Sequence, residues 1–207
     1  MKTIKIAVFL VLAVSLLAIT PQVYAAEGRR DNPNYFVLKG GVYSPSENYD
    51  ISNFNSGNTS RIDTKTGFNG EIAVGGYLLP VLAVELGVGY FESEGSAAAE
   101  PGTTKLKAIP VLVTAKGIIP IGAMELYGEF GIGAYITKLD VDGNFGSFSG
   151  QSKTTYGVHA GAGFNIDVSD TTFIGMEGRY LRAKPDYGGQ PVKLNGFTAT
   201  VDLGFRY

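Results

Sequence analysis

Apolar and polar residues alternate along the last eleven positions of the chain. Phe197, Ala199, Val201, Leu203, Phe205 and Tyr207 form one series, and the residues between them are Thr, Asp, Gly or Arg. Because neighbouring side chains of a strand point to opposite faces, this period predicts a strand with one apolar and one polar face. Its length also suits a tilted strand that crosses a bilayer, which takes about 9–11 residues.

Seven more stretches of this kind precede it, each rich in glycine, aromatic or β-branched residues. They lie at about 35–44, 66–78, 82–92, 105–118, 124–138, 154–166 and 171–182. The short connections are 79–81, 120–123 and 167–170, and the long polar ones are 45–65, 93–104, 139–153 and 183–193. Short turns on one rim and long loops on the other are typical of outer-membrane barrels. The sequence therefore predicts an all-β fold, an eight-stranded antiparallel up-and-down transmembrane β-barrel, with its long loops outside the cell.

The N-terminus has the three zones of a secretory signal peptide. Lys2 and Lys5 precede the apolar run Ile6–Ile19, and small residues end the segment at Ala25. We expect cleavage after Ala25, which leaves residues 26–207 as an outer-membrane β-barrel domain. The alternative is a membrane-anchoring helix, but the apolar run is shorter than the roughly 20 residues of a helical span.

Composition favours a membrane barrel over a soluble envelope protein. The chain has 29 Gly, 12 Tyr and 12 Phe, and only 17% of its residues are charged, against about a quarter in soluble domains. It has no cysteine, so an exported fold must obtain its stability from hydrogen bonding and packing. The formal net charge is −2, and no block of Lys or Arg follows the signal segment. Nucleic-acid binding is therefore not expected.

The period of two assigns the apolar side chains of each strand to a lipid-facing belt. Its predicted members are Phe36, Leu38, Val42, Phe68, Ile72, Val74, Leu82, Val84, Leu86, Val88, Ile109, Val111, Val113, Leu126, Phe130, Ile132, Val158, Phe164, Ile174 and Met176. Aromatic rings near strand ends suit the membrane interface. These are Tyr90, Tyr156, Tyr180, Phe197 and Tyr207.

The opposite faces carry charged residues in mid-strand. They are Lys39, Glu71, Glu85, Lys116, Glu125, Glu129, His159, Glu177, Arg179, Asp202 and Arg206. Facing lipid, a charge costs about 2–4 kcal/mol near the bilayer centre, so these side chains are predicted to point into the lumen. An eight-stranded lumen is just wide enough to be filled by side chains. We therefore expect an ion-pair network that plugs the barrel and leaves no apolar lumen.

The sequence resembles the outer-membrane β-barrel superfamily that includes the OmpX, Ail, opacity-protein and OmpA-barrel groups. The resemblance rests on Tyr35–Pro45 as the opening strand, Glu177–Tyr180 in the seventh and Phe205–Tyr207 at the end. It implies outer-membrane lipids and the barrel-assembly machinery as partners, with Leu203, Phe205 and Tyr207 similar to the assembly signal. That signal usually has Gly where this chain has Asp202.

A few residues could suggest a catalytic or a metal site, but their spacing favours a structural role. His159 is the only histidine, and the position that holds serine in barrel deacylases is Gly161, so a structural His is favoured. The run Asp140–Asn144 has its glycine at the wrong position for a calcium loop. Glu125 and Glu129 would be about 13 Å apart along a strand, too far for a glycosidase pair. No catalytic residue, cofactor or metal site is predicted.

Three functions remain open. The first is a structural or surface-interaction barrel that serves envelope integrity, adhesion or stress resistance, with long loops that could bind an extracellular ligand. The second is a narrow pore or small-molecule passage. The third is a lipid-modifying enzyme. An OmpW-like channel that opens sideways would need an apolar lumen, which the inward charges do not predict.

Overall fold

The computed structural model describes residues 33–46, 49–52, 59–97, 102–143, 148–149, 153–184, 186–187, 190–191 and 194–207. The predicted signal peptide lies outside these residues. The strands are β1 (Asn34–Pro45), β2 (Tyr49–Ser52), β3 (Thr59–Thr64), β4 (Gly67–Leu79), β5 (Leu82–Ala97), β6 (Gly102–Ile121), β7 (Met124–Gly143), β8 (Phe148–Ser149), β9 (Lys153–Asp167), β10 (Thr172–Ala183), β11 (Asp186–Tyr187), β12 (Gln190–Pro191) and β13 (Gly196–Arg206). No helix among these residues has the length and apolar character needed to cross a membrane.

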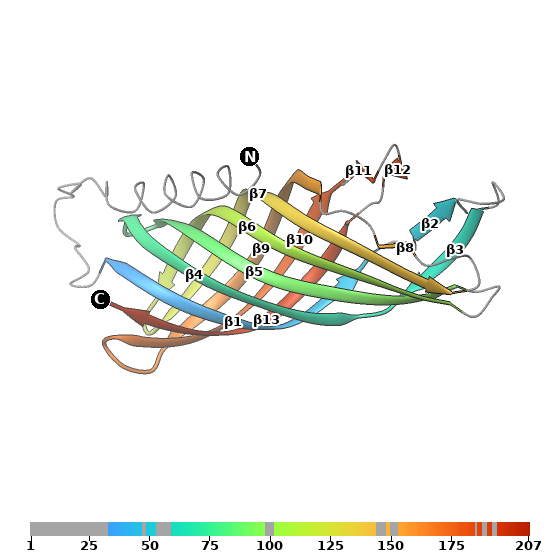
Figure 1. The fold of residues 1–207 in the computed structure, drawn as a ribbon. Helices are drawn as coiled ribbons and strands as arrows, with labels where there is room; N and C mark the ends of the chain where they lie inside the picture. The colour runs from blue at the N-terminus through green and yellow to red at the C-terminus, as the bar shows by residue number, and fades with distance from the viewer. Residues whose placement is uncertain are drawn as a thin grey trace. The chain divides into compact units, whose positions relative to one another are not determined.

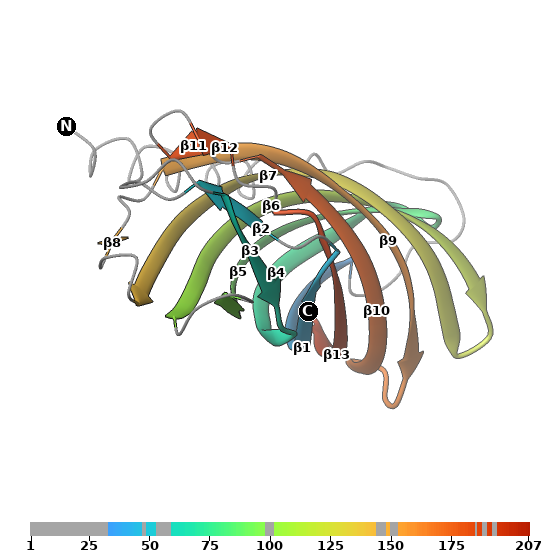
Figure 2. The same cartoon turned by 90° about the vertical axis from the view of Figure 1, so that its right-hand side faces the viewer.

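Eight of the strands form a closed ring of antiparallel pairs. The order around the ring is β1, β4, β5, β6, β7, β9, β10, β13 and back to β1. The first and last strands close it, with pairs that run from Tyr35 with Arg206 to Pro45 with Gly196. Figure 1 shows β1 and β13 side by side, and Figure 2 shows the strands curving around a common interior. The predicted eight-stranded antiparallel barrel is confirmed.

Short turns connect the strands at one rim, as predicted. The chain reverses between β4 and β5, between β6 and β7, and between β9 and β10 within a few residues. Gly122 has a φ of 61° in the turn between β6 and β7. This left-handed conformation is costly for other residues, which explains why glycine occupies the position.

Three strands are longer than the sequence pattern predicts. β5 has 16 residues, and β6 and β7 have 20 each, whereas β1 has 12. Much of the predicted loop 93–104 is therefore strand, and so is the beginning of the predicted loop 139–153. The alternation of apolar and polar residues stops near Glu92 because both faces become polar there. Backbone pairing continues nevertheless, because it does not depend on the side chains.

Small hairpins occupy other parts of the predicted long loops. β2 pairs with β3, and β3 pairs with β5 from Ile62 opposite Ala97 to Thr64 opposite Gly95. β8 pairs with β7, and β11 pairs with β12. In Figure 1, β2, β3 and β8 lie at the end of the barrel opposite the C-terminus. The rest of these predicted loops lies outside the described residues.

Burial alternates along every strand of the ring. On β13 the pattern is strictly buried and exposed in turn, and the predicted lipid-facing residues are all exposed or half-buried. Phe130 and Ile132 are each 60% exposed, a value that would be unusual for large apolar side chains on a soluble domain. The outer face is thus an apolar belt, and the buried face lines the interior.

Candidate functional site: a charged network between two apolar layers

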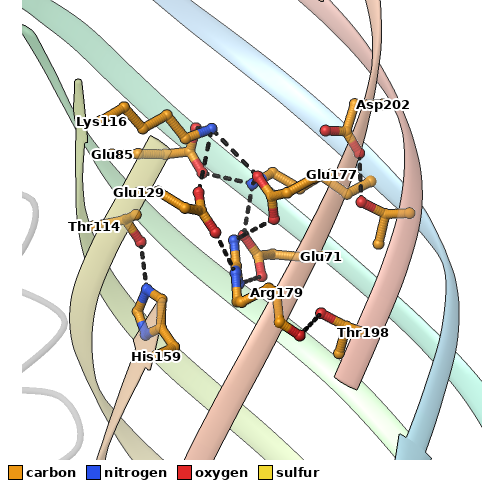
Figure 3. Close-up of polar contacts among 12 residues, drawn as sticks. Glu71, Glu85, Thr114, Lys116, Glu129, His159, Glu177, Arg179, Thr198 and Asp202 are labelled. Atoms are coloured by element: carbon orange, nitrogen blue, oxygen red, sulfur yellow. Dashed lines mark hydrogen bonds and ion pairs between the residues drawn. The ribbon is translucent and has the colours of Figure 1, made fainter. Parts of the chain in front are cut away.

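All eleven side chains that the sequence assigns to the lumen are buried, with exposed fractions between 1% and 7%. Seven of them form one cluster in the middle of the barrel. This central network consists of Lys39 from β1, Glu71 from β4, Glu85 from β5, Lys116 from β6, Glu129 from β7, and Glu177 and Arg179 from β10. Figure 3 shows these side chains converging from strands on several sides of the interior.

Arg179 joins three carboxylates. Its Nη1 lies 2.7 Å from Glu71 Oε2, its Nε lies 2.8 Å from Glu129 Oε1, and its Nη2 lies 2.6 Å from Glu177 Oε1. A guanidinium presents its donors in a fixed planar fork, which suits simultaneous contact with several carboxylates. Arg179 therefore fixes three strands, β4, β7 and β10, to one another through the interior.

Two lysines complete the network. Lys39 Nζ lies 2.7 Å from Glu85 Oε1 and 2.9 Å from Glu177 Oε2. Lys116 Nζ lies 2.7 Å from Glu85 Oε2 and 3.4 Å from Glu177 Oε2. Glu85 thus bridges the two lysines, and Glu177 contacts all three cations. The attraction between these opposite charges offsets the desolvation cost of burying each of them.

Tyrosine hydroxyls also belong to this site, although the sequence analysis did not name them. Tyr35 donates a hydrogen bond to Glu85 Oε2 at 3.1 Å, and Tyr127 donates one to Glu177 Oε2 at 3.2 Å. The ring of Tyr127 also lies under Lys116 Nζ, 4.5 Å from the ring centroid, which favours the cation. Both tyrosines share the inward series of their strands with predicted lumen residues, so the period of two contained the signal for them.

A layer of apolar side chains lies on each side of the network. Near the short turns the buried cluster contains Tyr35, Val37, Ala73, Ala83, Ile118, Tyr127 and Phe173, with Tyr77 packed against it. Toward the long strands the buried cluster contains Tyr43, Phe91, Leu106, Ala108, Leu112, Tyr135, Leu181, Ala183 and Leu194. We call these the inner and outer apolar layers.

The outer apolar layer corrects the expectation that the lumen is not apolar. Inward positions of β5 and β6 beyond the charged residues carry Phe91, Leu106 and Leu112, and Tyr43 stacks against Phe91 with ring centroids 4.4 Å apart. The expectation failed because only charged inward residues were counted. In the sequence, an apolar residue that points inward looks the same as one in the lipid-facing belt, unless each position of the strand is assigned to its face.

The remaining predicted lumen residues lie outside the central network. Arg206 Nη2 lies 2.7 Å from Asp167 Oδ1 and 3.5 Å from Glu125 Oε2, near the short turns. Tyr77 donates a hydrogen bond to Glu125 Oε2 at 2.8 Å. Thr200 donates one to Asp202 Oδ1 at 2.7 Å. The sequence analysis placed Asp167 in a turn, and the structure places its carboxylate beside Arg206.

His159 pairs with a residue that sequence reasoning missed. Its Nε2 lies 2.9 Å from Thr114 Oγ1, and the imidazole is 1% exposed. Gly131 on β7 makes room for the ring, because a Cβ at that position would lie 2.5 Å from His159 Cε1. A Thr–His pair could in principle carry out nucleophilic catalysis. Here both side chains are buried on the inward face of the barrel.

The ladder between β5 and β6 is interrupted beside the outer apolar layer. Val88 pairs with Val111 and Phe91 pairs with Ala108, but the residues between them do not pair, although the register is the same on both sides. Pro110 lies in this gap and has no N–H to donate. Its ring faces Gly89, where a Cβ would lie 3.2 Å from Pro110 Cγ. A residue larger than glycine would therefore crowd the proline.

Metal binding finds no support in the described part of the chain, which contains no group of three His, Asp or Glu side chains arranged to hold an ion. The predicted calcium-loop mismatch at Asp140–Asn144 lies partly outside the described residues.

A closed barrel with an apolar outer belt and a charged interior defines an integral protein of the bacterial outer membrane. The chain belongs to the family described as Outer membrane protein beta-barrel domain, whose sequence model matches residues 9–205. Members of this family serve varied roles, so family membership places the protein in the outer membrane of a Gram-negative bacterium without selecting an activity. No curated protein sequence matches the chain.

Solved structures share the fold at low sequence identity. OprG from Pseudomonas aeruginosa is 15% identical and has a TM-score of 0.65, with 85% of this chain and 97% of that chain covered. Ail from Yersinia pestis, in complex with the heparin analogue sucrose octasulfate, is 16% identical with a TM-score of 0.51, and 85% and 99% are covered. The protease OmpT from Escherichia coli is 11% identical with a TM-score of 0.52, and 89% and 99% are covered.

Proposed function

We propose that the protein is a structural and surface-interaction barrel whose interior is closed to ions by the central network and the two apolar layers. The observation that carries this proposal is the stacking of three buried layers across the lumen. An ion would have to leave water, pass aromatic and aliphatic side chains, and displace charges that are already paired. Each of these steps is costly in a low-dielectric interior.

Conductance of the purified protein in planar bilayers tests the closed interior. We expect wild type to show little steady conductance and Arg179→Ala to leak more, because three carboxylates then lose their shared cation. Arg182→Ala is the matched control, since Arg182 lies on the same strand but on the exposed outer face. Large, stable conductance from wild type would overturn the proposal and favour a pore.

Surface interaction is supported by the long strands. β5, β6 and β7 extend past the other strands, and β3 adds to the edge of β5. Edge strands and hairpins that project from a rigid barrel can present a binding surface. The similar Ail structure holds a sulfated sugar, so an anionic sugar is a suitable first probe.

Replacement of residues 49–64 by a short Gly–Ser turn tests this role. The barrel should still fold, because the hairpin lies outside the ring of eight strands. We expect expressing cells to lose adherence to immobilised heparin. If wild-type cells do not adhere to heparin, we expect the replacement to lower their tolerance of envelope stress. Unchanged behaviour in both assays would remove the hairpin from the proposed function.

We also propose that the protein is not an enzyme, on the basis that His159 and Thr114 are both buried. OmpT shows that this fold can support proteolysis, so the point needs a direct test. His159→Ala should leave the lipid composition of the outer membrane and the cleavage of test peptides unchanged. An activity present in wild type and lost in His159→Ala would establish a catalytic role.

A second candidate function is passage of a small apolar molecule. The outer apolar layer adjoins the unpaired segment between β5 and β6 at Gly89 and Pro110, where the ladder between these two strands is interrupted. Pro110→Val should restore the missing donor and strengthen the wall. If uptake of a short alkane by expressing cells falls in Pro110→Val but not in Val111→Ile, passage gains support. Equal uptake with wild type, both variants and empty cells would exclude it.

A further inference from the structure

Carboxylates outnumber cations in the described interior of the barrel. Among the described residues, six carboxylates are buried, but only four Lys or Arg side chains are. These carboxylates belong to Glu71, Glu85, Glu125, Glu129, Glu177 and Asp202. An uncompensated charge is costly in a low-dielectric interior, and a buried carboxyl group avoids this cost when it takes up a proton. The excess of carboxylates therefore favours a bound proton inside the barrel.

Asp202 on β13 differs from the other buried carboxylates in its contacts. Each of the five buried glutamates has a Lys or Arg nitrogen at 3.5 Å or less. Asp202 is 2% exposed and forms no ion pair with any described residue. Thr200 donates a hydrogen bond to Asp202 Oδ1 at 2.7 Å, and Figure 3 shows Asp202 beside the central network with this single contact. Asp202 is thus the buried carboxyl group whose charge no ion pair offsets.

Lys39 is placed to pair with Asp202 but contacts glutamates instead. The two residues lie directly opposite each other on β1 and β13, and the Cβ atoms of such a pair are about 4.5–5.5 Å apart, within reach of an ion pair. The Lys39 ammonium lies 2.7 Å from Glu85, 2.9 Å from Glu177 and 3.3 Å from Glu71. An ionised Asp202 would compete for this ammonium. The observed pairing is therefore the one expected when Asp202 is neutral.

The other charged and titratable groups around Asp202 do not compensate its charge at close range. Besides Lys39, the groups that face it are Glu177 on β10, Lys116 on β6 and Tyr127 on β7. Lys116 is engaged by Glu85 at 2.7 Å, and Glu177 is itself an anion. Arg206, four positions along β13, contacts Asp167 at 2.7 Å near the short turns. Protonation is thus the direct way to lower the cost of burying Asp202.

We propose that Asp202 is a proton-binding site and that its proton selects the partners of Lys39. At mildly acidic pH, Asp202 is neutral and Lys39 binds Glu85 and Glu177, as in the structure. When the pH rises, the proton leaves the Asp202 carboxyl group for water, and the new carboxylate attracts the Lys39 ammonium away from Glu177. The central network then has two arrangements, and the pH selects between them. This switch does not require that the interior be closed to ions.

Infrared spectroscopy of the folded barrel in phosphatidylcholine vesicles tests the proton site, because a protonated carboxylic acid has a carbonyl band separate from the carboxylate bands. The pH is raised from about 5 to about 9, a range in which ordinary Asp, Glu and Lys side chains largely keep their charge. We expect a carboxylic-acid band that disappears as the pH rises and that Asp202→Asn lacks. Asn has the shape of a protonated Asp, and a heat-induced shift on gels verifies folding. Glu129→Gln is the matched control and should keep the band, because Glu129 has Arg179 at 2.8 Å. A wild type without the band, or a band that Asp202→Asn leaves unchanged, would overturn the proposal.

Urea unfolding over the same pH range gives a second measurement of the proton. Asp202 is ionised in the unfolded chain throughout this range, so the folded chain holds one more proton. The unfolding equilibrium constant should therefore rise by up to about tenfold per pH unit until the folded Asp202 has lost its proton. Asp202→Asn should remove this part of the slope. Thr200→Val should carry it to higher pH, because the Thr200 hydroxyl stabilises the carboxylate. Equal slopes in wild type and Asp202→Asn would refute the site.

Solid-state nuclear magnetic resonance tests the change of partner. With labelled lysine nitrogen and aspartate carbon, a contact between Lys39 Nζ and Asp202 Cγ should be present at about pH 9 and absent at about pH 5, on either side of the expected proton release. The contact between Lys39 and Glu177 should weaken over the same interval. If the contacts of Lys39 were the same at both pH values, Asp202 would not select its partners and the switch would be refuted.

Discussion

Two groups of ion pairs in this protein have the same chemistry but different surroundings. In the central network, Lys39 and Arg179 contact glutamates with side chains at most 5% exposed. On the outer face of β5 and β6, Lys105 contacts Glu92 and Glu94, and these three side chains are 29% to 66% exposed. Distances overlap, at 2.6–3.3 Å in the first case and 3.2–3.5 Å in the second. Burial, and not distance, should therefore decide what each pair contributes.

The physical reason is the fate of the charge that remains when its partner is removed. On the surface, water and salt solvate that charge, and the loss is small. Inside the barrel there is no such replacement, so the remaining charge retains its desolvation cost. The following predictions test this contrast, beginning with the largest expected effect.

Arg179→Met should lower the free energy of unfolding by about 3–5 kcal/mol, because Glu71, Glu129 and Glu177 lose their common cation. Urea unfolding in phospholipid vesicles measures the change. Far-UV circular dichroism is the suitable probe, because the chain contains no tryptophan. Arg182→Met on the outer face of the same strand is the control. If both substitutions lowered stability equally, the network would not be a special source of stability.

Removal of a carboxylate in the same background should restore part of the loss. In Arg179→Met, Glu129 has lost its 2.8 Å partner, so adding Glu129→Gln removes a charge that is poorly compensated. We expect a coupling energy of about 0.5–3 kcal/mol between the two sites in a double-mutant cycle. Additive effects would show that Glu129 finds another partner, with Lys116 at 3.8 Å the nearest cation available.

Tyr35→Phe tests the hydrogen-bonded edge of the network. The substitution removes the donor to Glu85 Oε2 and keeps the ring in the inner apolar layer. Since Glu85 still has Lys39 and Lys116, the expected loss is about 1.5 kcal/mol, the lower end for a hydrogen bond to a charged group. The same urea titration applies, with Tyr180→Phe as control, because Tyr180 packs on Phe197 at the barrel surface. A loss above that of Arg179→Met would reverse the ranking.

The barrel could be predicted from the sequence because the residue pattern within each strand shows which of its two faces is apolar. Side chains alternate with a period of two, so Phe197 and Tyr207 at the ends of one strand already assign every residue between them. The strand order followed from the short turns. What failed was the length of β5, β6 and β7, because Glu92 and Ser93 place polar groups on both faces and the alternation ends while pairing continues.

The interior was only partly predictable for a related reason. Inward charges such as Glu85 stand out in a strand, whereas Tyr135 or Leu112 looks like any apolar residue unless its face is tracked. Contacts between strands that are not neighbours, such as Arg179 on β10 with Glu71 on β4, depend on register and on the twist of the whole barrel. The pairing of two strands does not encode these distances, so sequence could name the charged residues but not their partners.

The smallest expected effect is that of Lys105→Ala, and it completes the comparison with Arg179. Lys105 donates a hydrogen bond to Glu94 at 3.2 Å, and this contact raises the pKa of Lys105 above its ordinary value. The lysine is therefore charged, yet water can replace it beside both glutamates. We expect a stability loss that is small beside that of Arg179→Met in the urea titration, and smaller still at high salt, because exposed pairs are screened. Arg179→Met should be nearly insensitive to salt under the same conditions. A loss for Lys105→Ala as large as that for Arg179→Met, persisting at high salt, would show that burial does not explain the difference between the two groups of ion pairs.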